Sequence, residues 1–135
     1  TYEDDISKEG IGRIGKLPME QSLEECAKLC KEAFDINQVR VYGEPDSLVE
    51  LVAIVPGSGK DYIETALGKQ ADVYITGDIG HHHGLDAMEQ GLAIIDAGHY
   101  GVEKIFIPYM VDFFASQMPE LQVCRAVEKA PFYDV

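Results

Sequence analysis

A histidine and a glutamate four residues apart, His99 and Glu103, form a spacing that suits metal chemistry. An apolar segment ends in Asp96, Gly98 follows as a turn residue, and His99 begins a predicted helix. Residues i and i+4 share one face of a helix, so the imidazole and the carboxylate can reach the same cation. One nitrogen and one oxygen ligand favour zinc, iron, manganese or cobalt. The alternative is a surface helix whose acidic residue simply interacts with the helix dipole.

Three consecutive histidines, His81, His82 and His83, follow a Thr-Gly-Asp turn that ends at Asp78. Successive helical residues point about 100° apart, so at most one or two of these rings can reach a shared ion. The histidines, Asp78 and Asp96 are candidates for further ligands, because a catalytic zinc takes about three protein ligands. An exposed helix start without function is the alternative. We favour a functional role, because that alternative leaves the strand and its Thr-Gly-Asp turn unexplained.

A Gly-Ser-Gly segment at residues 57–59, followed by Lys60, resembles part of a phosphate-binding loop. Its glycines would let backbone N–H groups approach an anion near Asp61. However, Asp61 stands where such loops carry Ser or Thr, and a tight turn that needs glycine explains the segment equally well. A second glycine pattern, at residues 10, 12 and 15, has no apolar strand before it and no helix after it. We therefore do not interpret that pattern as a dinucleotide-binding loop.

The chain has three cysteines, Cys26, Cys30 and Cys124. Small secreted domains carry dense, paired cysteines, so this sparse and odd number indicates a reducing compartment, the cytoplasm. Cys26 and Cys30 are four residues apart and could share a metal. They also belong to an apolar stripe at helical spacing that includes Leu23 and Phe34. We interpret them as core residues, because free cysteine packs as a small hydrophobic side chain.

The elements that must position these residues alternate along the chain. The predicted helices span residues 19–35, 61–69, 82–90 and 100–118. The predicted strands span residues 39–43, 48–55, 71–76, 92–95 and 121–127. Ser22 and Glu25 fit a capping box for the first helix, and Pro108 predicts a kink near residues 104–108. This alternation predicts an α/β fold: a three-layer domain with a mainly parallel or mixed sheet and helices on both faces.

Length and composition indicate one globular domain. The 135 residues are 46% hydrophobic and 26% charged, which allows a single core over residues 10–135 behind a flexible lead-in over residues 1–9. With 24 acidic and 11 basic residues the net charge is −13, so we expect neither a nucleic-acid nor a membrane partner. No apolar run approaches the ~18 residues of a membrane span. The first residue, Thr1, indicates a processed N-terminus or a piece of a longer protein.

Two blocks of the sequence resemble the C-terminal half of the Nif-three family, whose members are dinuclear metal-centre proteins often called GTP cyclohydrolase I type 2 homologues. The blocks read Val73-Tyr-Ile-Thr-Gly-Asp-Ile-x-x-His82 and Gly91-Leu-Ala-Ile-Ile-Asp-Ala-Gly-His-Tyr-x-x-Glu103. The segments at residues 10–17 and 57–59 are similar to that family in their order. The resemblance covers the chain from about residue 10, and it implies that residues 10–135 are the C-terminal half of a longer protein.

The resemblance implies that His99 and Glu103 bind metal, with two divalent ions (zinc, iron or manganese) in each full-length subunit. It implies that His82 lies beside the metals as a proton shuttle or substrate contact. The remaining ligands belong to an N-terminal half that has no counterpart here, so we expect an incomplete site and no activity from these residues alone.

For the full-length protein, the resemblance implies a metal-dependent hydrolase acting on a small molecule, for which a nucleotide or phosphoester is the candidate. It also implies a homo-oligomer, similar to the ring-shaped hexamers of the family. The alternative is a non-catalytic metal-binding scaffold or a protein-interaction module.

Overall fold

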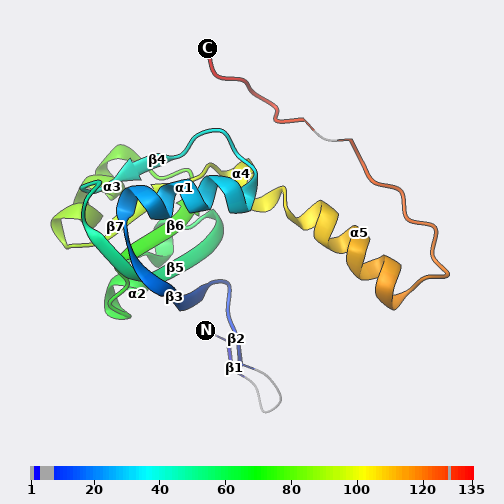
Figure 1. The fold of residues 1–135 in the computed structure, drawn as a ribbon, viewed down its shortest axis with the longest axis horizontal. Coiled ribbons are helices and arrows are strands. Elements are labelled where there is room, and N and C mark those ends of the chain that lie inside the picture. The colour runs from blue at the N-terminus through cyan, green and yellow to red at the C-terminus, as the bar shows by residue number, and fades with distance from the viewer. Residues whose placement is uncertain (1, 4–7, 128) are drawn as a thin grey trace.

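A five-stranded mixed sheet forms the centre of the computed structural model, which describes residues 2–3, 8–127 and 129–135 (Figure 1). In sheet order its strands are β3 (Arg13–Ser22), β5 (Leu48–Ser58), β6 (Val73–Gly77), β7 (Ala93–Asp96) and β4 (Arg40–Tyr42). The three central strands are parallel, and both edge strands are antiparallel to their neighbours. The predicted α/β fold with a mixed sheet is confirmed.

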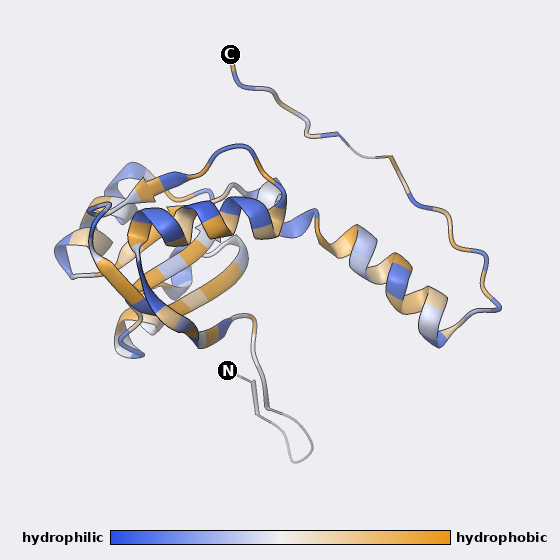
Figure 2. Ribbon diagram, viewed as in Figure 1, coloured by the Kyte–Doolittle hydropathy of each residue, from blue (hydrophilic) through white to orange (hydrophobic). Residues whose placement is uncertain are grey.

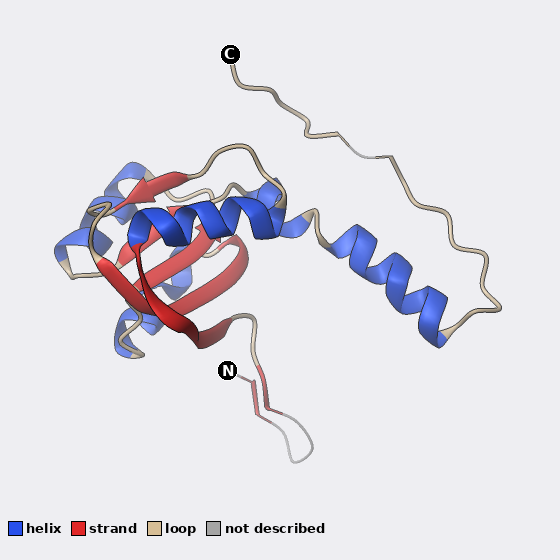
Figure 3. Ribbon diagram, viewed as in Figure 1, coloured by secondary structure: helices blue, strands red, loops and turns tan. Residues whose placement is uncertain are grey.

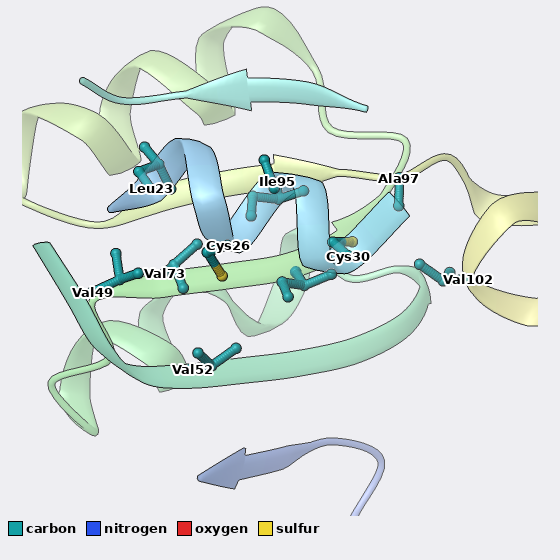
Figure 4. Packing of buried hydrophobic residues seen from close by; sticks show 11 residues of the cluster. Leu23, Cys26, Cys30, Val49, Val52, Val73, Ile95, Ala97 and Val102 are labelled. Carbon is teal, nitrogen blue, oxygen red and sulfur yellow. The ribbon is translucent and has the colours of Figure 1, made fainter. Parts of the chain in front are cut away.

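Helices cover both faces of this sheet. The helical segments of the described residues are α1 (Leu23–Phe34), the 3₁₀ turn η1 (Lys60–Tyr62), α2 (Ile63–Gly68), α3 (His81–Glu89), α4 (His99–Glu103) and α5 (Phe106–Gln117), of which α5 projects away from the sheet (Figure 1). Side chains on one face of the sheet pack against α1, which turns its apolar stripe inward (Figures 2 and 4). Side chains on the other face pack against α2 and α3. Successive residues of β6 point to opposite faces of the sheet, so its side chains pack alternately into the two cores.

Two predictions about α1 are confirmed, and one boundary is wrong. Ser22 and Glu25 form the capping box, and Cys26 and Cys30 are buried in the core beneath α1. Burial raises the pKa of both thiols, that of Cys30 to about 12. The helix begins at Leu23, not at residue 19, because the preceding residues extend β3 and pair with β5 up to Ser22.

The strand β5 is longer than predicted. The prediction ended it at residue 55, but it continues to Ser58 through a register shift after Ile54. Gly57 has a φ of 68°, a left-handed conformation that glycine adopts at little cost. The glycine pattern at residues 10–15 leads into β3 and no helix follows it, which agrees with rejecting it as a dinucleotide loop.

The C-terminal part departs most from the prediction. The helix expected over residues 100–118 is divided into α4 and α5 at Lys104 and Ile105, which lie within the range 104–108 where a kink was predicted. Pro108 is the third residue of α5, where its missing N–H leaves no helical hydrogen bond unmade. The strand expected over residues 121–127 does not form; these residues are exposed, because α5 leads the chain away from every sheet edge (Figure 3).

Two further expectations concern the chain's ends and membranes. Strands β1 (Tyr2–Glu3) and β2 (Lys8–Glu9) pair with each other, whereas the rest of the predicted lead-in, residues 1 and 4–7, lies outside the described residues. Within the described ranges, no helix has both the length and the apolar character needed to cross a membrane.

Candidate metal centre

The predicted site residues gather where the three parallel strands end. The strands β5, β6 and β7 run in the same direction, so Gly57 of β5, Asp78 after β6 and His99 after β7 lie at one edge of the sheet. Open α/β sheets bind their ligands outside this carboxyl edge.

His99 and Glu103 face each other on α4. The distance between His99 Nε2 and Glu103 Oε2 is 3.2 Å, and both side chains are about half exposed. Two donors that each lie about 2.0–2.2 Å from one ion, at an angle between octahedral and tetrahedral, are roughly 3.0–3.5 Å apart. The pair therefore has the spacing of two ligands to a shared cation, and its nitrogen and oxygen donors suit zinc, iron or manganese.

Asp78 supports His99 from the end of β6. Its Oδ1 accepts the backbone N–H of His99 at 3.2 Å, and its Oδ2 lies 3.8 Å from His99 Nδ1. A carboxylate facing the second ring nitrogen is the arrangement that orients a metal-ligating imidazole. Asp78 has a φ of 55°, a strained conformation that aims its side chain at α4. The structure thus places Asp78 on the Nδ1 side of the His99 ring, whereas Glu103 faces Nε2.

Asp96, considered above as a metal ligand, instead accepts hydrogen bonds from the backbone. Its Oδ1 accepts the N–H groups of Asp78 and Gly98, both at 2.9 Å, and its Oδ2 accepts that of Ile79 at 2.8 Å. Both carboxylate oxygens are therefore committed to backbone donors. Asp96 ties the turn after β6 to the turn after β7, which sets the position of α4 relative to Asp78.

Two glycines leave room for the pair. A Cβ added to Gly57 would lie 3.0 Å from Glu103 Oε1 and 3.4 Å from His99 Nε2. A Cβ added to Gly77 would lie 2.5 Å from the backbone N of His99, so β6 and the start of α4 can meet only because residue 77 lacks a side chain. Sequence patterns did not reveal this function of Gly57, although the residue lies in the Gly-Ser-Gly segment.

Backbone groups of the Gly-Ser-Gly segment are used in hydrogen bonds to buried side chains of β6. The N–H of Gly59 donates to Thr76 Oγ1 at 2.9 Å, and the carbonyl oxygen of Gly59 accepts the hydroxyl of Tyr74 at 2.7 Å. Both polar side chains are buried, and burial raises the pKa of Tyr74 to about 12. Of the two interpretations left open, the structure supports the tight turn, because the N–H of Gly59 is already used.

The three histidines lie at the exposed start of α3. The rings of His81 and His82 meet edge to face, with centroids 5.5 Å apart. In the part of the chain that the structure describes, no hydrogen bond or ion pair joins His82 to His99 or Glu103. No group of three His, Cys, Asp or Glu side chains among the described residues is placed to hold a metal ion. Among the described residues, His99 and Glu103 thus remain a pair of candidate ligands.

A large open pocket of about 720 Å³ borders the pair. Glu103 lines it together with Pro56, Tyr100 and the first turn of α5, and its walls are mainly apolar. No residue of α5 is buried, and the exposed fractions of Phe106 and Tyr109 are 64% and 67%.

Comparison with known proteins gives consistent results. The model of the family Duf34/NIF3 (NGG1p interacting factor 3) matches residues 2–131. The chain is 46% identical over 99 residues to the "GTP cyclohydrolase 1 type 2 homolog" of Bacillus subtilis, covering 73% of this chain and 26% of that protein. The Lactococcus lactis protein of the same name is 36% identical over 132 residues, covering 95% of this chain and 51% of that protein. A Bacillus cereus protein related to NIF3 has a similar structure (TM-score 0.79, 33% identity), covering 93% of this chain and 36% of that one.

Proposed function

The chain belongs to the Duf34/NIF3 family, and we propose that it contributes His99 and Glu103 to the dinuclear metal centre of a metal-dependent hydrolase. The chain spans 26% and 51% of the length of the two curated relatives compared above, so the activity of a whole protein of that length is part of the proposal. The observation that carries the proposal is the 3.2 Å spacing of His99 Nε2 and Glu103 Oε2 beside Gly57.

The proposal gives each neighbouring side chain a task. His99 and Glu103 would hold the metal, for which zinc, iron or manganese fits a nitrogen and a carboxylate ligand. A bound divalent ion supplies Lewis-acid chemistry: it polarises the substrate and lowers the pKa of water. Asp78 would keep the His99 ring oriented through Nδ1. His82 would give or take a proton at the substrate, because a histidine side chain can serve as a general acid or a general base.

We propose a small-molecule substrate, with nucleotides and phosphoesters as the first classes to examine. The names of the relatives refer to GTP. Further parts of the proposal are a cytoplasmic location and a homo-oligomeric full-length protein. A non-catalytic scaffold or interaction module is the second candidate, and the unburied apolar helix α5 favours it, because exposed apolar patches of this kind mark contact surfaces.

Calorimetric titration of the 135 residues with zinc and manganese tests the metal assignment. At about 0.15 M salt the Debye length is ~8 Å, so nonspecific attraction of cations to the net charge of −13 is reduced. We expect weak binding, because two protein ligands leave an ion mostly hydrated. His99→Ala should abolish it and leave the thermal transition almost unchanged, whereas His83→Ala serves as the matched control. Tight binding that survives His99→Ala would move the site, most simply to His81–His83.

The full-length protein distinguishes hydrolase from scaffold. Metal-loaded protein is screened against nucleotides and phosphoesters, and His99→Ala and His82→Ala variants are compared with it. Turnover that disappears with His99→Ala supports the hydrolase. Bound metal without any turnover that depends on His99 supports the scaffold.

A further inference from the structure

We infer that a groove between β3 and α2 binds a small aromatic carboxylate, at a site separate from the metal-ligand pair. The groove has a volume of about 170 Å³. Its lining comes from the start of β3, the middle of β5, the α2 region and Tyr74 of β6. Figure 1 shows α2 beside β3 at the same side of the sheet.

The groove exists because α2 is short and its inward side chains are small. Ala66 of α2 and Ala53 of β5 line the groove and are buried, with exposed fractions of 4% and 6%. Ile14 of β3 lies opposite Ala53 in the antiparallel pair, so its side chain points to the α2 face. The exposed fraction of Ile14 is 44%, because the six residues of α2 do not extend over this edge strand.

Two tyrosines, Tyr74 and Tyr62, are among the residues that line the groove. The ring of Tyr74 is fully buried, and its hydroxyl is held by the carbonyl oxygen of Gly59 at 2.7 Å. Tyr62 also lines the groove, and its exposed fraction is 38%. The exposed side chains of Tyr62 and Ile14 offer apolar surface to a flat ring, and aromatic pairs gain energy beyond the area that they bury.

The charge of the groove is opposite to that of the protein. The chain carries a net charge of −13, yet among the residues that the structure describes the groove is lined by Arg13 and Lys69 and by no acidic residue. Arg13 Nη1 donates to the carbonyl oxygens of Gly10 and Gly12, at 2.7 and 2.9 Å, which holds the guanidinium at the start of β3. The two cations favour an anion there, and this charge complementarity selects the ligand class.

The size of the groove limits the ligand to about one ring. An engineered apolar cavity of roughly 150 Å³ accepts benzene. A single aromatic ring therefore fits the apolar part of the groove, and its carboxylate reaches the basic side chains at the rim. Larger ligands would extend into solvent.

Titration of the ¹⁵N-labelled chain with benzoate, monitored by amide chemical shifts in the presence of EDTA, tests the inference. We expect the shifts to concentrate at Gly12, Thr65 and Lys69, which line the groove. Benzamide has the same ring without the charge and should bind at least fivefold more weakly. Lys69→Met should weaken benzoate binding twofold to fivefold, as expected for an exposed ion pair. Lys69 is exposed, so this variant should fold.

Two further variants separate the groove from other sites. Lys31→Met, on α1, removes the same charge outside the groove and should leave benzoate binding unchanged. His99→Ala should also leave it unchanged, so the inference and the proposed metal site can fail independently. Equal binding of benzoate and benzamide, an equal effect of Lys31→Met, or shifts concentrated elsewhere would each overturn the inference.

Discussion

Replacing Gly57 by alanine should separate the geometry of the candidate metal pair from the stability of the fold. The added Cβ would lie 3.0 Å from Glu103 Oε1 and 3.4 Å from His99 Nε2, whereas ordinary contacts of a Cβ begin near 3.4 Å. The Glu103 oxygen is the end of a flexible side chain, so it can move away. The carboxylate should therefore shift by about 0.4 Å without a large steric penalty.

Two independent effects determine how much Gly57→Ala should change the free energy of unfolding and the zinc affinity. A residue with a Cβ in the left-handed region costs roughly 1–2 kcal/mol, and Gly57 has a φ of 68°. Metal-ligand distances tolerate only about ±0.2 Å, and changes in residues that support the ligands typically cost 10-fold to 100-fold in metal affinity. We expect Gly57→Ala to lower the free energy of unfolding by about 1–2 kcal/mol and zinc affinity at least 10-fold.

The variant Gly91→Ala is a matched control that separates the effect on zinc affinity from the effect on stability. Gly91 has a φ of 87°, and an added Cβ there meets no atom within 4 Å. Gly91→Ala should thus lose similar stability through its backbone alone and keep the zinc affinity of the parent chain. Urea denaturation measures the free energy of unfolding, and calorimetry measures the zinc affinity. If Gly57→Ala bound zinc as well as Gly91→Ala does, our argument that Gly57 makes room for the pair would be refuted.

Three further predictions concern buried groups. Thr76→Val removes the acceptor of the Gly59 N–H, so urea denaturation should show a loss of about 1–3 kcal/mol, whereas Thr76→Ser should stay near the parent value. A Cβ on Gly84 would lie 2.2 Å from Tyr42 Cε1, so Gly84→Ala should cost about 1–3 kcal/mol in the same assay, and an unchanged midpoint would contradict this packing. Burial raises the pKa of Cys30 from 9.0 to about 12; the unfolded thiol ionises first, so the free energy of unfolding should fall between these pH values. Cys30→Ala should reduce that slope, by up to about 1.4 kcal/mol per pH unit.

Local patterns were sufficient to predict several features of this protein. The alternation of apolar strands with helices indicated the α/β fold, because each element's periodicity is encoded within its own residues. The capping box of Ser22 and Glu25 is a contact between residues three apart. The facing of His99 and Glu103 follows from helical geometry alone, and the structure brings them to 3.2 Å.

Features that depend on a distant partner could not be predicted in this way. Residues 13–22 have little apolar alternation, and they form β3 because β5 offers an edge to pair with. The converse holds for residues 121–127, whose apolar residues predicted a strand that does not form, because α5 leads them away from the sheet. Pairing between strands is a property of the sheet, so the sequence of one segment does not determine it.

The surroundings of the candidate site were also decided by the tertiary structure. Asp78 and Asp96 are the same residue type and looked equivalent as possible ligands. The turns after β6 and β7 bring three backbone N–H groups to Asp96 and leave Asp78 facing His99 Nδ1. Gly57 makes room for a pair that lies more than forty residues further along the chain. The sequence determined which side chains could do chemistry, whereas the register of the parallel strands decided which of them meet, because only the folded sheet brings its carboxyl ends together.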